Sequence, residues 1–217
     1  MENKNLILQV LVGSRAHKLH DTGSDYDYRG VYVLPTSDIL SLGYKYKVNE
    51  WMEGGIDNTS YEISHFLNLA IHCNPSILEV FKAPIKETNE DGKKLRELFP
   101  YVWNPKQAFD AFTGYSKNQR KKFLENKDKR RNKYAVAYIR TLINLIDLLE
   151  HGTFNLEVNF LAEELKNFKR GYYNVGEVID LAERLTRIAQ DRLEKCKHEP
   201  NIDKVNQFLI EIRKRYW

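Results

Sequence analysis

The stretch that decides the fold is residues 6–35, LILQVLVGSRAHKLHDTGSDYDYRGVYVLP, in which two apolar runs flank a short polar segment. The first run ends in a Gly-Ser pair at 13–14, and the second opens with Asp25 and Asp27. Successive side chains of a β-strand point to opposite faces, so these two carboxylates are predicted to project from one face. Carboxylates that close repel each other unless a cation lies between them, and a divalent metal ion is the usual partner.

The Gly-Ser pair predicts a phosphate-binding corner beside those carboxylates. Gly13 permits a tight turn from strand to helix, and Ser14 then starts a short helix whose first N–H groups are free to hold a phosphate. Such a corner next to a metal-binding pair suits an enzyme that acts on a nucleoside triphosphate. An ordinary turn over residues 22–25 would explain Asp25. It would not explain Asp27, which lies inside an apolar pattern where Asp is disfavoured.

The order of these residues resembles the signature of the DNA polymerase β-like nucleotidyltransferase superfamily, and in particular its RNA repair pathway polymerase-β family. The matching residues are Gly13, Ser14, Ala16, Ser24, Asp25, Asp27, Arg29, Gly30 and Val31. The resemblance extends over about residues 6–152. It implies an α+β fold, in which a polymerase-β-like domain with a small mixed sheet flanked by helices precedes an all-α domain.

The resemblance also implies a catalytic metal site for Mg²⁺ or Mn²⁺. In this family a third carboxylate usually comes from a neighbouring strand, completes one metal site and accepts the proton of the attacking hydroxyl. Asp57 is assigned that role, so the catalytic and metal-binding residues are expected to be Asp25, Asp27 and Asp57. Glu62 is the alternative, although an acid near a helix N-terminus is favoured by the helix dipole alone.

The resemblance implies an NTP substrate, ATP among the candidates, from which an NMP moves to an acceptor hydroxyl. The expected nucleotide-binding residues are Gly13, Ser14, Arg29, Lys133 and Arg140. An RNA end, from a tRNA or a damaged RNA, is one acceptor. A protein or a small molecule is another, and a non-catalytic nucleotide- or RNA-binding module is a further alternative. The sequence does not set the oligomeric state.

Short strands and helices alternate in the first part of the chain, and helical periodicity dominates the rest. Strands are expected at residues 6–12, 26–34, 44–52, 56–60 and 84–88, with helices at 15–19, 61–72 and 76–81. Further helices are expected at 91–99, 105–124, 132–151, 156–168, 175–196 and 202–216. This pattern predicts a catalytic domain at 1–90 and a helical domain at 91–217.

Residues 117–133 carry a dense positive charge. The nine basic residues are Lys117, Arg120, Lys121, Lys122, Lys127, Lys129, Arg130, Arg131 and Lys133, and Glu125 and Asp128 oppose them. The segment is either a contact for phosphates or a solvated helix end and loop. On the following helix, Arg140 lies beside an apolar stripe and needs a partner, either Asp147 or Glu150 or a substrate phosphate.

Composition favours an ordinary globular protein without a membrane span. The 217 residues are 42% hydrophobic and 29% charged, with a net charge of +4. No apolar run reaches membrane-spanning length, and the N-terminal apolar stretch lacks the features of a signal peptide. Cys73 and Cys196 have no metal or redox spacing, which is typical of reduced thiols and predicts a cytoplasmic location.

Overall fold

The computed structural model describes residues 5–44, 48–53, 56–157 and 161–217, and for residues 48–53 and 56–57 it describes the backbone alone. Five strands form one mixed sheet in the order β3-β4-β2-β1-β5. These are β1 (Leu6–Val12), β2 (Tyr26–Tyr32), β3 (Val48–Glu53), β4 (Ile56–Glu62) and β5 (Ile85–Thr88). The β2–β4 pair is parallel, and the other neighbouring pairs are antiparallel. The predicted small mixed sheet is confirmed.

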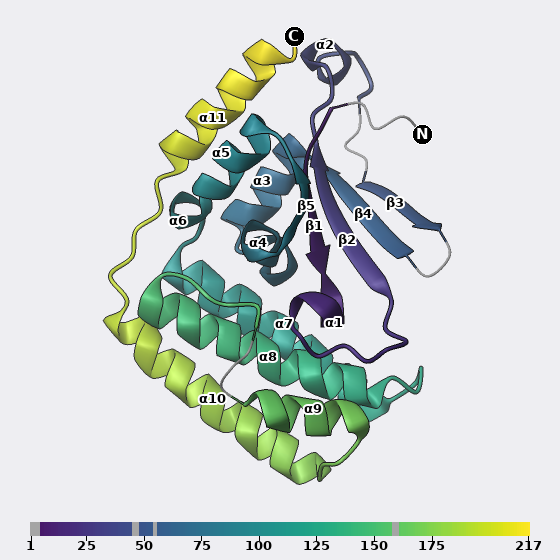
Figure 1. Cartoon of the computed structure of the whole chain (residues 1–217). Helices are drawn as coiled ribbons and strands as arrows, with labels where there is room; N and C mark the ends of the chain where they lie inside the picture. The colour runs from purple at the N-terminus through teal and green to yellow at the C-terminus, as the bar shows by residue number, and fades with distance from the viewer. Residues whose placement is uncertain (1–4, 45–47, 54–55, 158–160) are drawn as a thin grey trace.

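Six short helices lie between the strands or directly after the last of them (Figure 1). They are α1 (Gly13–Ala16), α2 (Thr36–Ile39), α3 (Ile63–Ile71), α4 (Pro75–Lys82), α5 (Glu90–Glu97) and α6 (Phe99–Val102). The remaining helices are α7 (Pro105–Glu125), α8 (Arg131–His151), α9 (Ala162–Arg170), α10 (Val175–Lys195) and α11 (Ile202–Arg215). Helices α7 to α10 lie together below the sheet in Figure 1, and α11 runs back up beside α3 and α5. From α5 onward the described residues contain helices but no strand, as predicted.

The hydrophobic core runs without interruption from the sheet into the helices. One cluster joins Ile7 and Val10 of β1 to residues as distant as Leu145 of α8 and Phe208 of α11. A Cβ on Gly92 would lie 2.0 Å from the carbonyl oxygen of Ile7, so α5 packs directly on β1. The predicted domain division at residue 90 therefore falls at a helix that packs on the sheet, and it stays a prediction.

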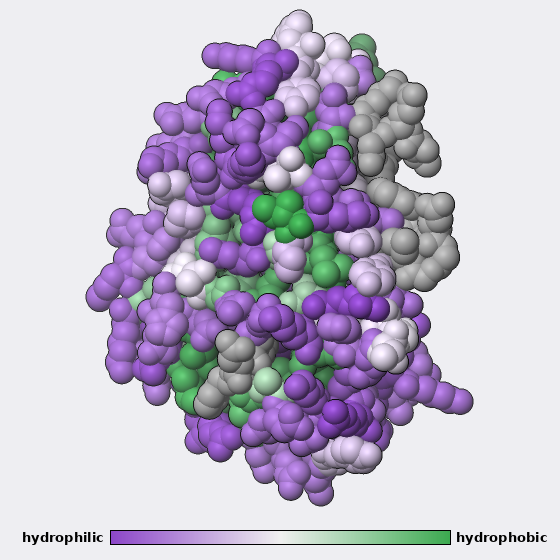
Figure 2. All heavy atoms as spheres, in the orientation of Figure 1, coloured by the Kyte–Doolittle hydropathy of each residue, from purple (hydrophilic) through white to green (hydrophobic). Residues whose placement is uncertain are grey.

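A second cluster holds α7 to α10 together around Phe123, Ile139 and Val178. Leu19, from the loop between α1 and β2, is buried in this helical cluster. The helices therefore contact the segment that carries the Gly-Ser pair. Most of the face in Figure 2 is hydrophilic, and hydrophobic side chains show in small areas at its middle and between the lower helices.

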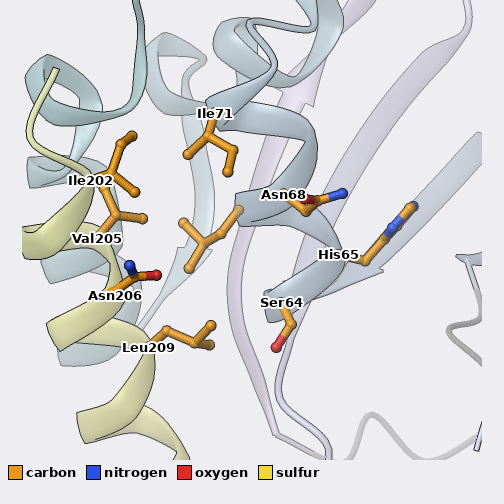
Figure 3. A pocket seen from close by; sticks show the side chains of 9 residues that line it. Ser64, His65, Asn68, Ile71, Ile202, Val205, Asn206 and Leu209 are labelled. Carbon is orange, nitrogen blue, oxygen red and sulfur yellow. The ribbon is translucent and has the colours of Figure 1, made fainter.

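Ion pairs with two buried carboxylates attach α11 to the end of β4 and to α5. Glu62 at the end of β4 is fully buried and pairs with Arg213 at 2.6 Å, while Arg215 and the Tyr216 hydroxyl bind the buried Asp91. Nearer the start of α11, this helix and α3 leave a cavity of about 420 Å³ lined mainly by aliphatic side chains (Figure 3). No described helix combines the length and apolar character needed to cross a bilayer.

Several boundaries differ from the sequence prediction. Strand β2 begins at Tyr26 as predicted but ends at Tyr32 instead of residue 34, and Asp25 directly precedes it. Helix α1 spans Gly13–Ala16 instead of residues 15–19. Strand β3 begins at Val48, and residues 45–47 of the predicted strand lie outside the described residues. Helix α9 begins at Ala162 instead of residue 156, and residues 158–160 lie outside the described residues. Leu156 is not helical. Its side chain is buried, and its carbonyl accepts a hydrogen bond from His17.

Candidate active site

The end of β1 brings a glycine directly against a carboxylate. Gly13 follows the last residue of β1 with φ of +69°, a conformation that favours glycine. Val12 pairs with Asp27 across the antiparallel β1–β2 ladder. A Cβ added to Gly13 would lie 2.1 Å from Oδ2 of Asp27, so a larger residue would displace that carboxylate. Gly13 of the predicted Gly-Ser corner and the predicted metal ligand Asp27 therefore lie in contact.

The parallel pairing of β2 and β4 sets Asp57 beside Asp27. The two residues are register partners, so their α-carbons are neighbours across the sheet, although the side chain of Asp57 lies outside the described part. Asp25 is exposed, immediately before β2. Glu62 is the register partner of Tyr32 on β2, five residues further along β4 than Asp57, a distance of about 16 Å. There its side chain binds Arg213 and caps α3. Glu62 therefore has a structural role away from Asp27.

Two cations hold the loop that leads into Asp25. The Arg15 guanidinium donates to the carbonyl of Ser24 from Nε (3.1 Å) and Nη2 (2.9 Å), and it stacks 3.8 Å from the centre of the Tyr26 ring. From α9, the ammonium of Lys169 contacts the carbonyl of Leu19 (2.5 Å), Asp21 Oδ2 (2.7 Å) and the Ser24 hydroxyl (3.4 Å). The hydrogen bond and charge of Lys169 lower the pKa of Asp21. Sequence reasoning identified neither cation.

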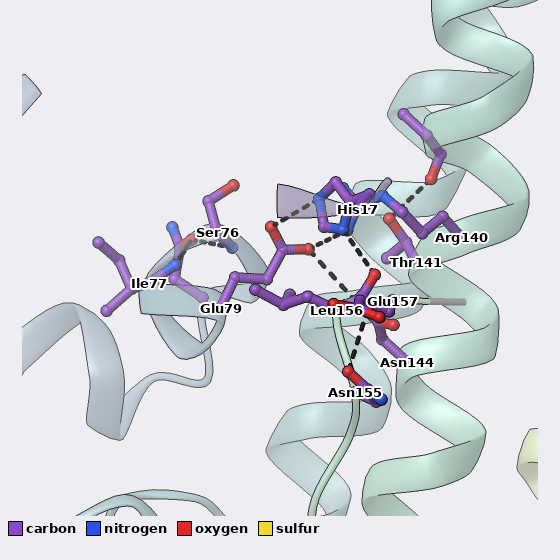
Figure 4. A network of polar contacts seen from close by, with 12 residues as sticks. His17, Ser76, Ile77, Glu79, Arg140, Thr141, Asn144, Asn155, Leu156 and Glu157 are labelled. Atoms are coloured by element: carbon purple, nitrogen blue, oxygen red, sulfur yellow. Dashed lines mark hydrogen bonds and ion pairs between the residues drawn. The ribbon is translucent and has the colours of Figure 1, made fainter. Parts of the chain in front are cut away.

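Helices α4 and α8 supply a buried polar network behind the corner (Figure 4). Glu79 of α4 binds the guanidinium of Arg140, and the side-chain amide of Asn144 donates to it at 3.3 Å. Only 11% of the Arg140 side chain and 13% of the Glu79 side chain are exposed. The partner of Arg140 is thus Glu79, neither Asp147 nor Glu150, and Glu150 pairs instead with Arg192.

His17, at the end of α1, joins this network to the corner. Its Nδ1 donates to the carbonyl of Leu156 at 2.9 Å, and its Nε2 lies 3.7 Å from Glu79. Burial, with the charge of Arg140 next in size, lowers the pKa of His17 from 6.5 to about 4, although Glu79 opposes the shift. His17 is therefore neutral in the folded protein at pH 7.

The lowered pKa of His17 predicts a loss of stability in mild acid. Between pH 6.5 and 4 the unfolded chain binds a proton at His17 that the folded protein does not, so stability rises with pH across this window. We expect about 3 kcal/mol of the free energy of unfolding to disappear as the pH falls through it. Urea unfolding of the wild type and of His17→Gln at pH 7, 5.5 and 4 measures this. Identical pH dependence in both proteins would contradict the expectation.

The other predicted nucleotide-binding residues lie on three different elements, and not all of them are near the Gly-Ser pair. Ser14 is half-buried in α1 directly after Gly13. Arg29 is half-buried in β2, two residues beyond Asp27, and its Nη1 donates to the carbonyl of Tyr28 at 2.9 Å. Lys133 is exposed in the first turn of α8 and lines a groove there. The structure thus joins Gly13, Ser14 and Asp27, whereas Arg140 is held by Glu79 and Lys133 belongs to the groove.

A metal site cannot be built from the described side chains alone. No three His, Cys, Asp or Glu side chains gather as metal ligands among those residues, a set that leaves out the side chain of Asp57. The predicted ligand set Asp25, Asp27 and Asp57 stays a prediction.

Comparisons with known proteins match one family model and find similar proteins. A sequence model of the RNA repair pathway DNA polymerase beta family matches residues 1–211. The uncharacterized protein YcgL of Bacillus subtilis (strain 168) is 25% identical over 209 residues, which cover 94% of this chain and 76% of that protein. A crystal structure of a nucleotidyltransferase-like protein from Exiguobacterium sibiricum aligns with 97% of this chain and 74% of its own, at 11% identity and a TM-score of 0.32. Similarity of that last degree supports no inference about function.

Proposed function

Because this chain belongs to the RNA repair pathway DNA polymerase beta family, we propose that it is a metal-dependent nucleotidyltransferase that moves an NMP from an NTP to an acceptor hydroxyl. Membership of the family supports a role in nucleotidyl transfer in general. The observation that carries the specific proposal is the contact between Gly13 and the carboxylate of Asp27. A glycine corner of the kind that binds phosphates then lies against an acid that can hold a cation.

Asp25, Asp27 and Asp57 are the proposed ligands of Mg²⁺ or Mn²⁺. Carboxylate oxygens suit these hard cations, and the register of β2 and β4 makes Asp57 the neighbour of Asp27. When bound, the metal neutralises charge on the triphosphate and lowers the pKa of the acceptor hydroxyl. Asp57 accepts the hydroxyl proton, the acceptor oxygen forms a bond to the α-phosphorus, and the bond from that phosphorus to the pyrophosphate oxygen breaks.

The proposed phosphate contacts come from the corner and the adjacent strand. The hydroxyl of Ser14 and the backbone beside it hold the β- and γ-phosphates, and Arg29 provides a positive charge two residues beyond Asp27. Arg140 is bound to Glu79, which also lies 3.7 Å from His17. Its proposed contribution is therefore to position α1, and with it the Gly-Ser pair, instead of touching the nucleotide.

An RNA end is the proposed acceptor, in view of the family description and the basic residues of the α7–α8 segment. The test incubates the protein with each of the four α-³²P NTPs, total RNA and total protein, in the presence of Mg²⁺ or Mn²⁺. We expect metal-dependent label that nuclease removes. Label removed by protease would overturn the RNA acceptor but keep the transferase, and the absence of metal-dependent label in every fraction would contradict the proposed function.

Substituting Gly13 by Ala should lower nucleotide transfer about 100-fold. The new Cβ would lie 2.1 Å from Oδ2 of Asp27, and displacement of a reacting group by about 1 Å costs this much. The control is Gly114→Ala in α7, where nothing lies within 4 Å of the added Cβ. It should keep full activity and stabilise the helix slightly. Equal activity of the two variants in the ³²P assay would show that the corner is not part of the site.

A further inference from the structure

A positively charged groove opens where α8 begins. It encloses about 500 Å³ between the α7–α8 loop, the start of α8 and the α9–α10 loop. Its lining is basic or polar apart from one glycine and one valine: Asn126, Lys129, Arg130, Arg131, Asn132, Lys133, Gly171, Tyr173 and Val175. Four of the nine basic residues in the 117–133 segment therefore converge on one concave surface.

Three of the basic residues of the groove lie at the N-terminus of α8, where positive charge destabilises a helix. Arg130 is the N-cap of α8 and gives no side-chain cap, and Arg131 and Lys133 lie in the first turn, which contains no acid. The N-terminus of a helix carries a partial positive charge, so cations there are repelled. The helix dipole therefore opposes this placement of cations, whereas a bound polyanion would be attracted by both the side chains and the dipole.

Nearby acids offset only part of this positive charge. Asp128 accepts hydrogen bonds from the hydroxyl of Tyr134 and from the backbone N–H of Arg130, and its charge attracts that of Arg130. Glu125 pairs with Lys127 outside the groove. Nε of Arg131 is fully buried and has no hydrogen-bond partner among the described residues. An unsatisfied buried donor of this kind is costly, so the folded protein holds the Arg131 side chain at the groove without a compensating hydrogen bond at Nε.

The floor of the groove is connected to the loop that precedes Asp25. The side chain of Asn132 accepts from the Tyr173 hydroxyl at 2.8 Å and donates to the backbone carbonyl of Lys169 at 3.2 Å. The side chain of the same lysine reaches the carbonyl of Leu19 and the hydroxyl of Ser24. One lysine side chain therefore separates the groove from the loop that leads into Asp25, and both lie at the lower right of Figure 1.

We propose that this groove binds the phosphate backbone of a single-stranded nucleic acid acceptor and leads its end toward Asp25 and Asp27. The inference rests on the proposed function for the identity of the active site. A volume of about 500 Å³ is on the scale of one or two nucleotides instead of the face of a duplex. Proteins that bind single-stranded nucleic acids commonly hold the backbone in a positively charged groove, and the four cations would contact the phosphates in this way. The phosphates of the NTP are held elsewhere, at the Gly-Ser corner.

Charge reversal in the groove tests the inference. The variant is Arg130→Glu with Lys133→Glu, and its control is Lys94→Glu with Lys197→Glu, two exposed lysines on α5 and after α10. Both double variants change the net charge by the same amount. Affinity for a fluorescein-labelled 12-nucleotide RNA is measured by anisotropy between 50 and 200 mM KCl, and affinity for Mg·NTP by calorimetry.

We expect the groove variant to bind the RNA at least about tenfold more weakly, with a slope of log affinity against log salt that is smaller by about 1.4, from two lost phosphate contacts. The control should stay within about twofold of the wild type. Affinity for Mg·NTP should not change. The melting temperature of the groove variant should not fall, because acids suit the start of a helix better than cations do.

Three results would overturn the groove as the acceptor site. In the first, the wild type does not bind RNA at 50 mM KCl. In the second, the groove and control variants lose RNA affinity equally. In the third, the groove variant loses affinity for Mg·NTP but not for RNA. The proposed function fails separately, if the wild type transfers no nucleotide although it binds RNA through the groove. An Asp27→Asn protein that binds RNA like the wild type keeps the two questions apart.

Discussion

Replacing Asp27 by Asn should lower nucleotide transfer by at least about 10³-fold while the protein still folds. The substitution keeps the shape of the side chain next to Gly13 and removes its charge. Loss of a metal-binding carboxylate removes several kcal/mol of transition-state stabilisation, and 1.36 kcal/mol corresponds to a factor of ten. Transfer of α-³²P label measures the activity, and circular dichroism and thermal unfolding establish that the fold is retained.

The matched control is Asp191→Asn, which makes the same chemical change at an exposed position of α10. Its activity should equal that of the wild type. Asp25→Asn should resemble Asp27→Asn, because the proposal gives both carboxylates the same cation. Unchanged labelling of the acceptor by the Asp27 variant would remove the basis of the proposed mechanism.

Arg140→Leu should destabilise the protein by about 3–5 kcal/mol. Glu79 would stay largely buried without the guanidinium that now compensates its charge, and breaking one side of a buried pair has this cost. Urea unfolding at pH 7 measures the loss. Because Glu79 also lies beside His17, the variant should loosen α1 and lower transfer activity even though Arg140 is not proposed to touch the nucleotide.

An exposed pair provides the comparison for this prediction. Arg192 and Glu150 lie 2.8 Å apart with about a third of each side chain accessible to solvent, so Arg192→Leu should cost no more than about 1 kcal/mol. A double variant, Glu79→Leu with Arg140→Leu, should recover part of the stability, because neither charge is then left unpaired. Equal destabilisation by Arg140→Leu and Arg192→Leu would contradict the structural role given to the buried network.

The parts of the site that the sequence predicted are those with a local signal. Gly13 and Asp27 stand at the ends of two apolar runs, and strand alternation with a glycine turn is enough to bring such residues together. The sequence also predicted strands at 44–52 and 56–60, and in the structure β3 and β4 pair antiparallel. That pairing, with the parallel register of β2 and β4, puts Asp57 beside Asp27.

The parts that the sequence did not predict depend on contacts between distant residues. Arg140 needed a partner, but Glu79 lies 61 residues earlier on another helix, and no local pattern links the two. Lys169 contacts the carbonyl of Leu19 from 150 residues away, and in the sequence it is one basic residue among several in its helix. Periodicity describes single elements, whereas these pairs are set by how the helices pack on the sheet.

The most direct test of the central claim compares an NTP labelled in the α-phosphate with the same NTP labelled in the γ-phosphate, using RNA and Mg²⁺. If the Gly13–Asp27 corner belongs to a nucleotidyltransferase, α-label alone moves to the acceptor and γ-label is released as pyrophosphate. Transfer of γ-label to the acceptor, or α-label transfer that Asp27→Asn leaves unchanged, would contradict it.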